Sequence, residues 1–263
     1  MGSILFINPV GHDTWDQEVK DYLTGYKNKD TELYVESMEK GLPEHLEYSY
    51  YEALIGEKLL HRMKRAEQEG FDACIIGCYY DPFLEAAREI CDRMVVTAPA
   101  EAAMHIGTTL GNSFSVLVVR NKTAPQMREY VYRHGNEKYL ASFRSLEIGV
   151  QELQKDPEFT KARMREEIRQ AVKEDKAEVI LLGCTIQMGF FRQLQEEFHV
   201  PIIDANIASL KYAEFLVALR DCGAGWYTSK AGMYETPPFE EIKRWGMERH
   251  FGVEGVWQGG KQH

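Results

Sequence analysis

Two cysteines occupy matching places in two similar stretches of this sequence. The first stretch reads Phe71-Asp-Ala-Cys-Ile-Ile-Gly-Cys78 and the second reads Lys176-Ala-Glu-Val-Ile-Leu-Leu-Gly-Cys184. Each is a short apolar run that ends in Gly-Cys and precedes a helix-like stretch and a second apolar run. A thiolate can act as a base and a thiol as an acid, so two opposed thiols can move a proton between the two faces of a carbon. The duplication therefore predicts a proton-transfer site formed by Cys78 and Cys184.

The thiol that acts as base needs a lowered pKa, because a free thiol with a pKa of ~8.5 is mostly protonated near neutral pH. Both cysteines precede an expected helix, and helix N-termini lower thiol pKa values. After Cys78, Asp81-Pro82 has the form of an N-cap followed by a proline in the first helical turn. We therefore expect helix N-termini to activate the thiols. The competing interpretation is a buried structural role, which is common for cysteine, and the repeated placement favours the functional one.

Apolar strand-like runs alternate with helical stretches along most of the chain. This alternation predicts an α/β fold with mostly parallel sheets flanked by helices, and the repeat predicts two such lobes. We expect residues 1–105, completed by 206–263, to form one lobe and residues 106–205 to form the other. The expected strands are 3–8, 31–37, 73–77, 94–97, 113–119, 143–148, 179–182 and 201–203.

Ligands in open α/β sheets bind at the carboxyl ends of the strands. Asn8, Cys78 and Cys184 all follow directly on, or end, an expected strand. We therefore expect these three residues to converge on one cleft between the lobes.

Composition narrows the classes of function. The 263 residues carry a formal net charge of −10, which argues against a nucleic-acid partner. No apolar run approaches the ~20 residues that span a bilayer, so we expect no membrane partner. The five cysteines contain no zinc-type pair and fit a reducing cytoplasm. No HExxH, Walker or GxGxxG motif occurs, so no motif indicates a metal or a cofactor, and a cleft at the strand ends suits a small-molecule substrate.

The ordered motifs resemble the aspartate/glutamate racemase superfamily, and within it the hydantoin racemase branch. The matching segments are Ile7-Asn8-Pro9, Gly77-Cys78 with Asp81-Pro82, Glu101-Ala102-Ala103, Phe114-Ser115-Val116, Leu182-Gly183-Cys184 and Val200-Pro201-Ile202-Ile203-Asp204. The resemblance implies two pseudo-symmetric lobes, an active site in the cleft between them, and cofactor-free chemistry with Cys78 and Cys184 as the acid/base pair. It implies that Asn8 contacts the substrate and that Thr185 offers its hydroxyl or backbone N–H to a carboxylate or ring carbonyl. Members are often oligomers, so a homo-oligomer is expected.

Three departures from the branch concern the substrate. Tyr79 and Tyr80 follow the first cysteine, where the branch usually has small residues. Val118 and Val119 stand where hydroxyl residues are usual. In the first loop, His12 follows Val10-Gly11, and Val10 replaces a second asparagine. We expect Tyr79, Tyr80, Val118, Val119 and His12 to contact the substrate, in a pocket that is more apolar or bulkier than usual.

The leading hypothesis is a racemase or epimerase that acts at an acidic Cα–H, in a 5-substituted hydantoin or an amino-acid derivative. Backbone N–H groups and hydroxyls near Asn8, Tyr79 and Thr185 would stabilise the enolate. One alternative is a cofactor-free decarboxylase or cis–trans isomerase of the arylmalonate or maleate type. The other is a non-catalytic small-molecule binding protein. The presence of both thiols favours racemisation over decarboxylation.

Overall fold

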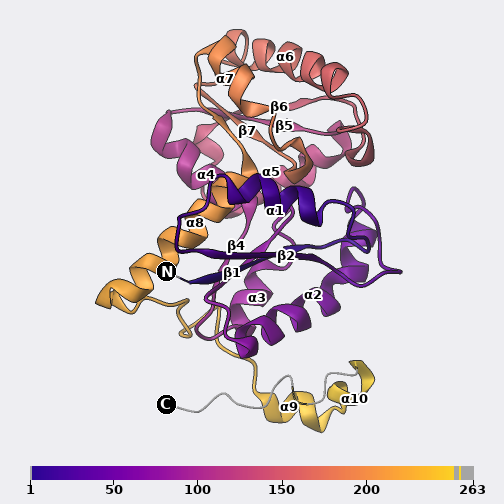
Figure 1. Ribbon diagram of the computed structural model, residues 1–263, viewed down its shortest axis with the longest axis vertical. Coiled ribbons are helices and arrows are strands. Elements are labelled where there is room, and N and C mark those ends of the chain that lie inside the picture. Colours follow the sequence, from indigo (N-terminus) through magenta and orange to yellow (C-terminus); the bar gives the residue numbers. More distant parts are fainter. Residues whose placement is uncertain (1, 252–254, 256–263) are drawn as a thin grey trace.

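The computed structural model describes residues 2–251 and residue 255 of the chain, and it contains two parallel four-stranded sheets (Figure 1). The first sheet has the strand order β2-β1-β3-β4 and the second has the order β6-β5-β7-β8, so the two are wound alike. The predicted α/β fold with two lobes is confirmed. The strands are β1 (Ser3–Asn8), β2 (Glu32–Ser37), β3 (Ala73–Ile76), β4 (Val95–Thr97), β5 (Phe114–Val118), β6 (Leu140–Ser145), β7 (Val179–Leu182) and β8 (Ile202–Ile203).

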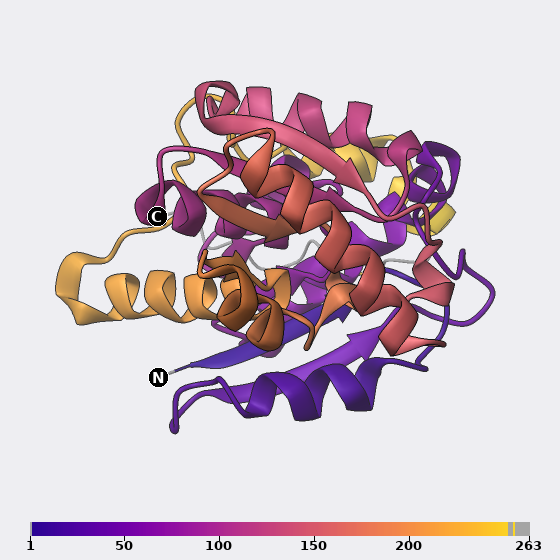
Figure 2. The ribbon, with the colours of Figure 1, turned by 90° about the horizontal axis from the view of Figure 1, so that it is seen from above.

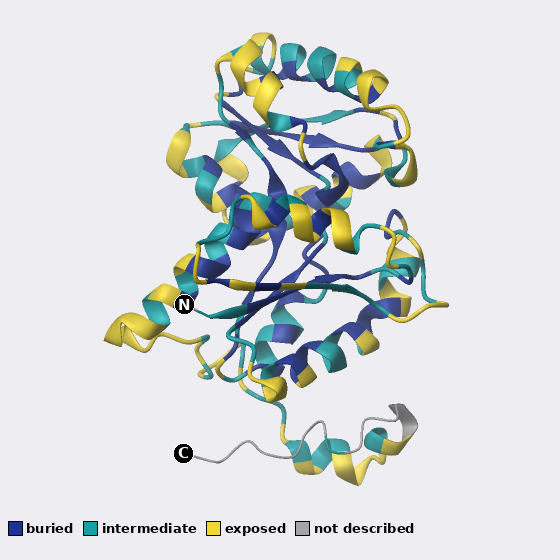
Figure 3. Cartoon of the chain, viewed as in Figure 1, coloured by how far each residue is buried: buried dark blue, intermediate teal, exposed yellow. Residues whose placement is uncertain are grey.

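Seven strands lie within one residue of the apolar runs that predict them, and β6 begins and ends three residues before its predicted range, 143–148. In β1, for example, Ile4, Leu5, Phe6 and Ile7 are all buried, because helices cover both faces of the sheet. A parallel sheet that is covered on both faces needs such continuous apolar runs. Figure 3 shows the buried residues concentrated along the strands of both lobes.

Two helices cross between the lobes. Helix α4 follows a strand of the first sheet but packs against β7 and β8 of the second. Helix α8 follows a strand of the second sheet but packs against β3 and β4 of the first. The two helices also pack against each other. Figure 1 shows α8 running from the junction of the lobes along the side of the first lobe, and Figure 2 shows its end projecting beyond the sheets.

Of the other helices, α1, α2 and α3 pack on the first lobe and α6 and α7 on the second. The helices are α1 (Asp16–Thr24), α2 (Ser49–Glu69), α3 (Leu84–Ile90), α4 (Pro99–Leu110), α5 (Ala124–Arg133), α6 (Pro157–Lys173), α7 (Phe191–Phe198), α8 (Ala205–Leu219), α9 (Phe239–Arg244) and α10 (Met247–Phe251). Within the described residues, no helix is both long enough and apolar enough to cross a membrane.

Candidate active site between the two lobes

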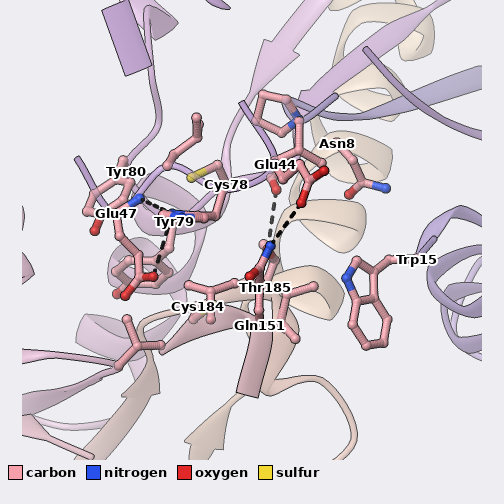
Figure 4. Close-up of a pocket in the computed structure, with 18 of the residues that line it drawn as sticks. Asn8, Trp15, Glu44, Glu47, Cys78, Tyr79, Tyr80, Gln151, Cys184 and Thr185 are labelled. Carbon is pink, nitrogen blue, oxygen red and sulfur yellow. Dashed lines mark hydrogen bonds and ion pairs between the residues drawn. The ribbon is translucent and has the colours of Figure 1, made fainter. Parts of the chain in front are cut away.

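The carboxyl ends of β1, β3 and β7 meet at one pocket between the lobes (Figure 4). Asn8 ends β1, Cys78 follows β3 and Cys184 follows β7, and all three line the pocket. The empty space of the pocket, open mouth included, is about 690 Å³. The structure thus brings together three residues that are far apart in the sequence.

A glycine precedes each cysteine because the neighbouring strand passes very close to it. A Cβ atom on Gly77 would lie 2.8 Å from the carbonyl oxygen of Ile7, and one on Gly183 would lie 3.0 Å from that of Leu117. The N–H of Gly77 donates to the same oxygen of Ile7 at 2.7 Å, and that of Gly183 to Leu117 at 3.0 Å. These equivalent bonds set both thiols at the same place in their lobes.

Protein atoms surround both sulfur atoms, although each cysteine keeps part of its surface open. Burial raises the pKa of the Cys78 thiol well above its usual range; the backbone N–H of Tyr80 opposes this, and the nearby Cys184 adds to it. Burial likewise raises the pKa of Cys184 to about 12, against the backbone N–H groups of Ile186 and Gln187. Both thiols are therefore protonated at neutral pH when the pocket holds no substrate.

The expected activation by helix N-termini is wrong, because neither cysteine directly precedes an α-helix. Helix α3 begins at Leu84, after residues in the left-handed region, and Cys184 leads into a short 3-10 turn, Thr185–Gln187. Asp81 does not cap α3 either. Its buried carboxylate accepts the backbone N–H groups of Ala100 and Glu101, each at 2.8 Å, and so caps helix α4.

The polar residues expected at the pocket are held by neighbours. The Nδ2 of Asn8 donates to Oδ1 of Asp16 at 2.6 Å. The hydroxyl of Thr185 donates across the lobes to the carbonyl oxygen of Gly77 at 3.3 Å, and Asn206 Nδ2 donates to the carbonyl oxygen of Thr185 at 2.7 Å. The hydroxyl hydrogen of Thr185 is therefore used within the protein.

Of the five residues expected to contact the substrate because they differ from the usual residues of the branch, four line the pocket and one does not. Tyr79, Tyr80, Val119 and His12 line the pocket. Both tyrosines are almost fully buried, and this burial raises the pKa of their hydroxyls. The expectation for Val118 is wrong: its side chain is completely buried in the core and does not line the pocket. Neighbouring residues of a strand point to opposite faces, so only one of the two valines can face the cleft.

Several pocket residues carry no strand or motif signal in the sequence. Four of them, Glu44, His45, Leu46 and Glu47, come from the loop between β2 and α2, and the others are Trp15, Met127, Val150, Gln151 and Ile186. The dense His/Glu content of residues 44–47, between an expected strand and helix, is the signal that could have marked the loop. In the described part of the chain, no lysine or arginine lines this pocket.

The walls of the pocket are largely apolar, with Trp15, Met127, Val119, Val150 and Ile186 exposed to it. Two thiols and several backbone N–H groups make up the polar centre. Among the described residues, no three His, Cys, Asp or Glu side chains are grouped so that they could hold a metal ion. The arrangement can transfer protons at a carbon acid within an apolar environment.

The fold and the pocket together define an α/β protein with one lobe on each side of the ligand site. The chain belongs to the Asp/Glu/Hydantoin racemase family, whose model matches residues 4–213. It is 36% identical to a hydantoin racemase of Pseudomonas sp. (strain NS671), over 90% of this chain and 93% of that protein. It is 35% identical to a hydantoin racemase of Paenarthrobacter aurescens, over 89% of this chain and 97% of that one.

A solved allantoin racemase from Klebsiella pneumoniae has the same fold, with a TM-score of 0.82 and 28% identity. The match covers 90% of this chain and 94% of that one. Together these relatives show that the protein is a racemase.

Proposed function

We propose that the protein racemises 5-substituted hydantoins, with Cys78 and Cys184 as its acid and base. The observation that carries this proposal is the Gly-Cys pair at the equivalent strand end of each lobe, with both thiols at one pocket. The similarity to hydantoin and allantoin racemases supports a ring of this kind, because allantoin is itself a hydantoin substituted at C5.

The reaction needs one thiolate and one thiol. The thiolate removes the proton from C5, and the electron pair of the C–H bond moves onto the neighbouring carbonyl as an enolate. The opposing thiol then donates its proton to the other face of C5, which leaves a thiol where the thiolate was and a thiolate where the thiol was. The side-chain amide of Asn8 has two hydrogens, of which Asp16 accepts one. We assign the other to the enolate oxygen.

The charges around the pocket favour this substrate over those of the alternative reactions. Malonates and maleate are dianions, and cationic side chains are one common way to bind them. The pocket instead presents the carboxylates of Glu44 and Glu47, and no described lysine or arginine lines it. A hydantoin ring is neutral and offers N–H donors, and the apolar walls suit an apolar substituent at C5.

Proton NMR in deuterated buffer tests the proposal, with each enantiomer of 5-benzylhydantoin and 5-isopropylhydantoin and with optical rotation followed in parallel. We expect the wild-type protein to exchange the C5 proton and abolish the rotation. Cys78→Ser and Cys184→Ser should each slow racemisation roughly 10²- to 10⁴-fold, the usual contribution of a general acid or base. Cys222→Ser is the matched control, because Cys222 is exposed and lies outside the pocket.

Full racemase activity in both pocket variants would contradict the two-thiol mechanism. Tight binding of a hydantoin with no exchange at C5 would instead support a binding protein. A maleate and an arylmalonate belong in the same panel, and turnover of either one without turnover of any hydantoin would favour the isomerase or decarboxylase alternative.

A further inference from the structure

Glu47 is a buried carboxylate in the pocket wall with an unfilled acceptor. Only 8% of its surface is exposed, and Oε1 accepts no hydrogen bond from any described residue. Its nearest cation is at ion-pair rather than hydrogen-bond distance, with Arg120 Nη1 3.7 Å from Oε1, and the ring atom His45 Nδ1 lies 3.6 Å from Oε2. Buried polar atoms nearly always have a hydrogen-bond partner, because burying such an atom without a hydrogen bond is costly in free energy. A donor from a ligand would complete this site.

The surrounding contacts fix where this carboxylate lies. Lys122 of the second lobe donates to the backbone carbonyl of Glu47 at 3.1 Å, although Glu47 itself belongs to a loop of the first lobe. Its Oε2 lies 3.8 Å from the position of a Cβ on Gly149, also in the second lobe. The side chain therefore bridges the two lobes at the pocket. Its charge also raises the pKa of the Cys184 thiol, in line with a position near the reacting centre.

We propose that Glu47 accepts a hydrogen bond from a ring N–H of the substrate and so positions C5 between Cys78 and Cys184. This inference rests on the proposed function and names Glu47 as the residue that determines which class of substrate binds. A hydantoin ring carries one N–H next to C5 and one between its two carbonyls, and a carboxylate is a strong acceptor for either. Free amino acids and dicarboxylates would bring their own carboxylate beside Glu47, and like charges repel. Glu47 thus selects neutral cyclic ureides.

N-methylated substrates test the contact in the wild-type protein. The kcat and KM for 5-benzylhydantoin are compared with those for its N1-methyl and N3-methyl derivatives. We expect methylation of the contacted nitrogen to lower kcat/KM about 10- to 100-fold, the range for a hydrogen bond to a charged group. Methylation of the other nitrogen should have a much smaller effect.

The Glu47→Gln variant then links the effect to this residue. It should lower kcat/KM for the parent hydantoin by a similar factor, chiefly through KM, and methylation of the contacted nitrogen should cost little more in this variant. Glu39→Gln is the matched control, since it removes the same charge from the same loop at an exposed position outside the pocket. Calorimetric titration of the parent hydantoin into Cys78→Ser, with and without Glu47→Gln, measures binding independently of turnover.

The outcomes separate this inference from the proposed function. A wild-type protein that racemises no hydantoin overturns the proposed function itself. A wild-type protein that racemises hydantoins but tolerates both methylations overturns the contact with Glu47, even if Glu47→Gln fails to fold. Equal penalties for methylation in the wild-type protein and in Glu47→Gln overturn it as well.

Discussion

At the scale of single residues, each pocket thiol sits at the end of a strand with backbone N–H groups as its nearest polar partners. These N–H groups stabilise a thiolate, but the loss of water around the sulfur outweighs them, so the pKa of both thiols is raised. Two neighbouring thiols also resist joint ionisation, since each thiolate raises the pKa of the other. The pocket therefore disfavours the state with two thiolates and keeps one thiol available as the acid when the other is ionised.

The raised pKa values predict a rate that increases with pH. The active base is the deprotonated form, and below its pKa the thiolate fraction grows about tenfold per pH unit. We expect kcat/KM for a 5-substituted hydantoin to rise from about pH 6 to about pH 8, below the pH at which the imide N–H between the two ring carbonyls ionises, as a polarimetric assay across that range would show. Cys222→Ser should give the same profile. A kcat/KM that is flat or falling over this range would contradict thiol bases with raised pKa values.

At the scale of elements, helix α4 depends on side chains from the first lobe. Asp81 accepts two N–H groups at its N-terminus. In the same first turn, Glu101 forms a buried ion pair with Arg88 of α3, with Oε2 2.5 Å from Nη2. Burial acts to raise the pKa of Glu101, but its bonds with Arg88 prevail and leave that pKa lowered. These contacts fasten a helix that packs on the second sheet to the loop that carries Cys78.

Asp81→Ala should destabilise the fold. It removes both acceptors from buried N–H groups, and we expect the free energy of unfolding to fall by about 2–4 kcal/mol, as measured by urea denaturation. Asp156→Ala is the matched control: Asp156 is exposed and accepts a single N–H, from Phe159, at the start of α6. That variant should lose only about 1 kcal/mol. Equal losses in the two variants would show that Asp81 does not hold α4 in this way.

At the scale of the whole molecule, the two lobes are joined on both sides of the pocket. Helix α4 connects from the first lobe and packs on the second, helix α8 does the reverse, and the two helices pack against each other. In front, residues 44–47 of the first lobe are held by the second lobe: Gln151 Nε2 donates to Glu44 Oε2 at 3.3 Å, and Lys122 Nζ to the Glu47 carbonyl at 3.1 Å. The distance between the thiols therefore depends on contacts that neither lobe makes alone.

Lys122→Met should weaken substrate binding more than it weakens the fold. The change removes the bond to Glu47 and the cation–π contact with Tyr48, whose ring centroid lies 4.5 Å from Nζ. We expect KM to rise roughly 2- to 10-fold, the range for the loss of one hydrogen bond to an uncharged acceptor. The melting temperature should change little. Lys138→Met is the matched control, because Lys138 stacks on Tyr139 at 4.8 Å but lines no part of the pocket. Unchanged KM in Lys122→Met would show that this bond does not hold the loop for substrate.

The sequence by itself determined the strands and the pair of Gly-Cys motifs. Burial on both faces of a parallel sheet demands continuous apolar runs, and such runs are visible locally, as in β1 and β7. The glycine before each thiol reflects a close strand neighbour, and it recurs because the lobes are wound alike. The prediction that Asn8, Cys78 and Cys184 lie at one pocket needed only their positions at the carboxyl ends of predicted strands.

Only the tertiary structure decided what surrounds those thiols. Asp81 looks like a cap for the next helix in the sequence, but it caps α4, because a left-handed turn directs its carboxylate elsewhere. Val118 and Val119 are equivalent in sequence and both are buried, but only Val119, which follows the end of β5, lines the pocket. Glu47 belongs to a loop whose sequence has no helical or strand periodicity. Its position at the pocket follows from contacts with residues of the second lobe, which are distant in the sequence. Such contacts depend on packing between distant segments, which no local pattern of residues records.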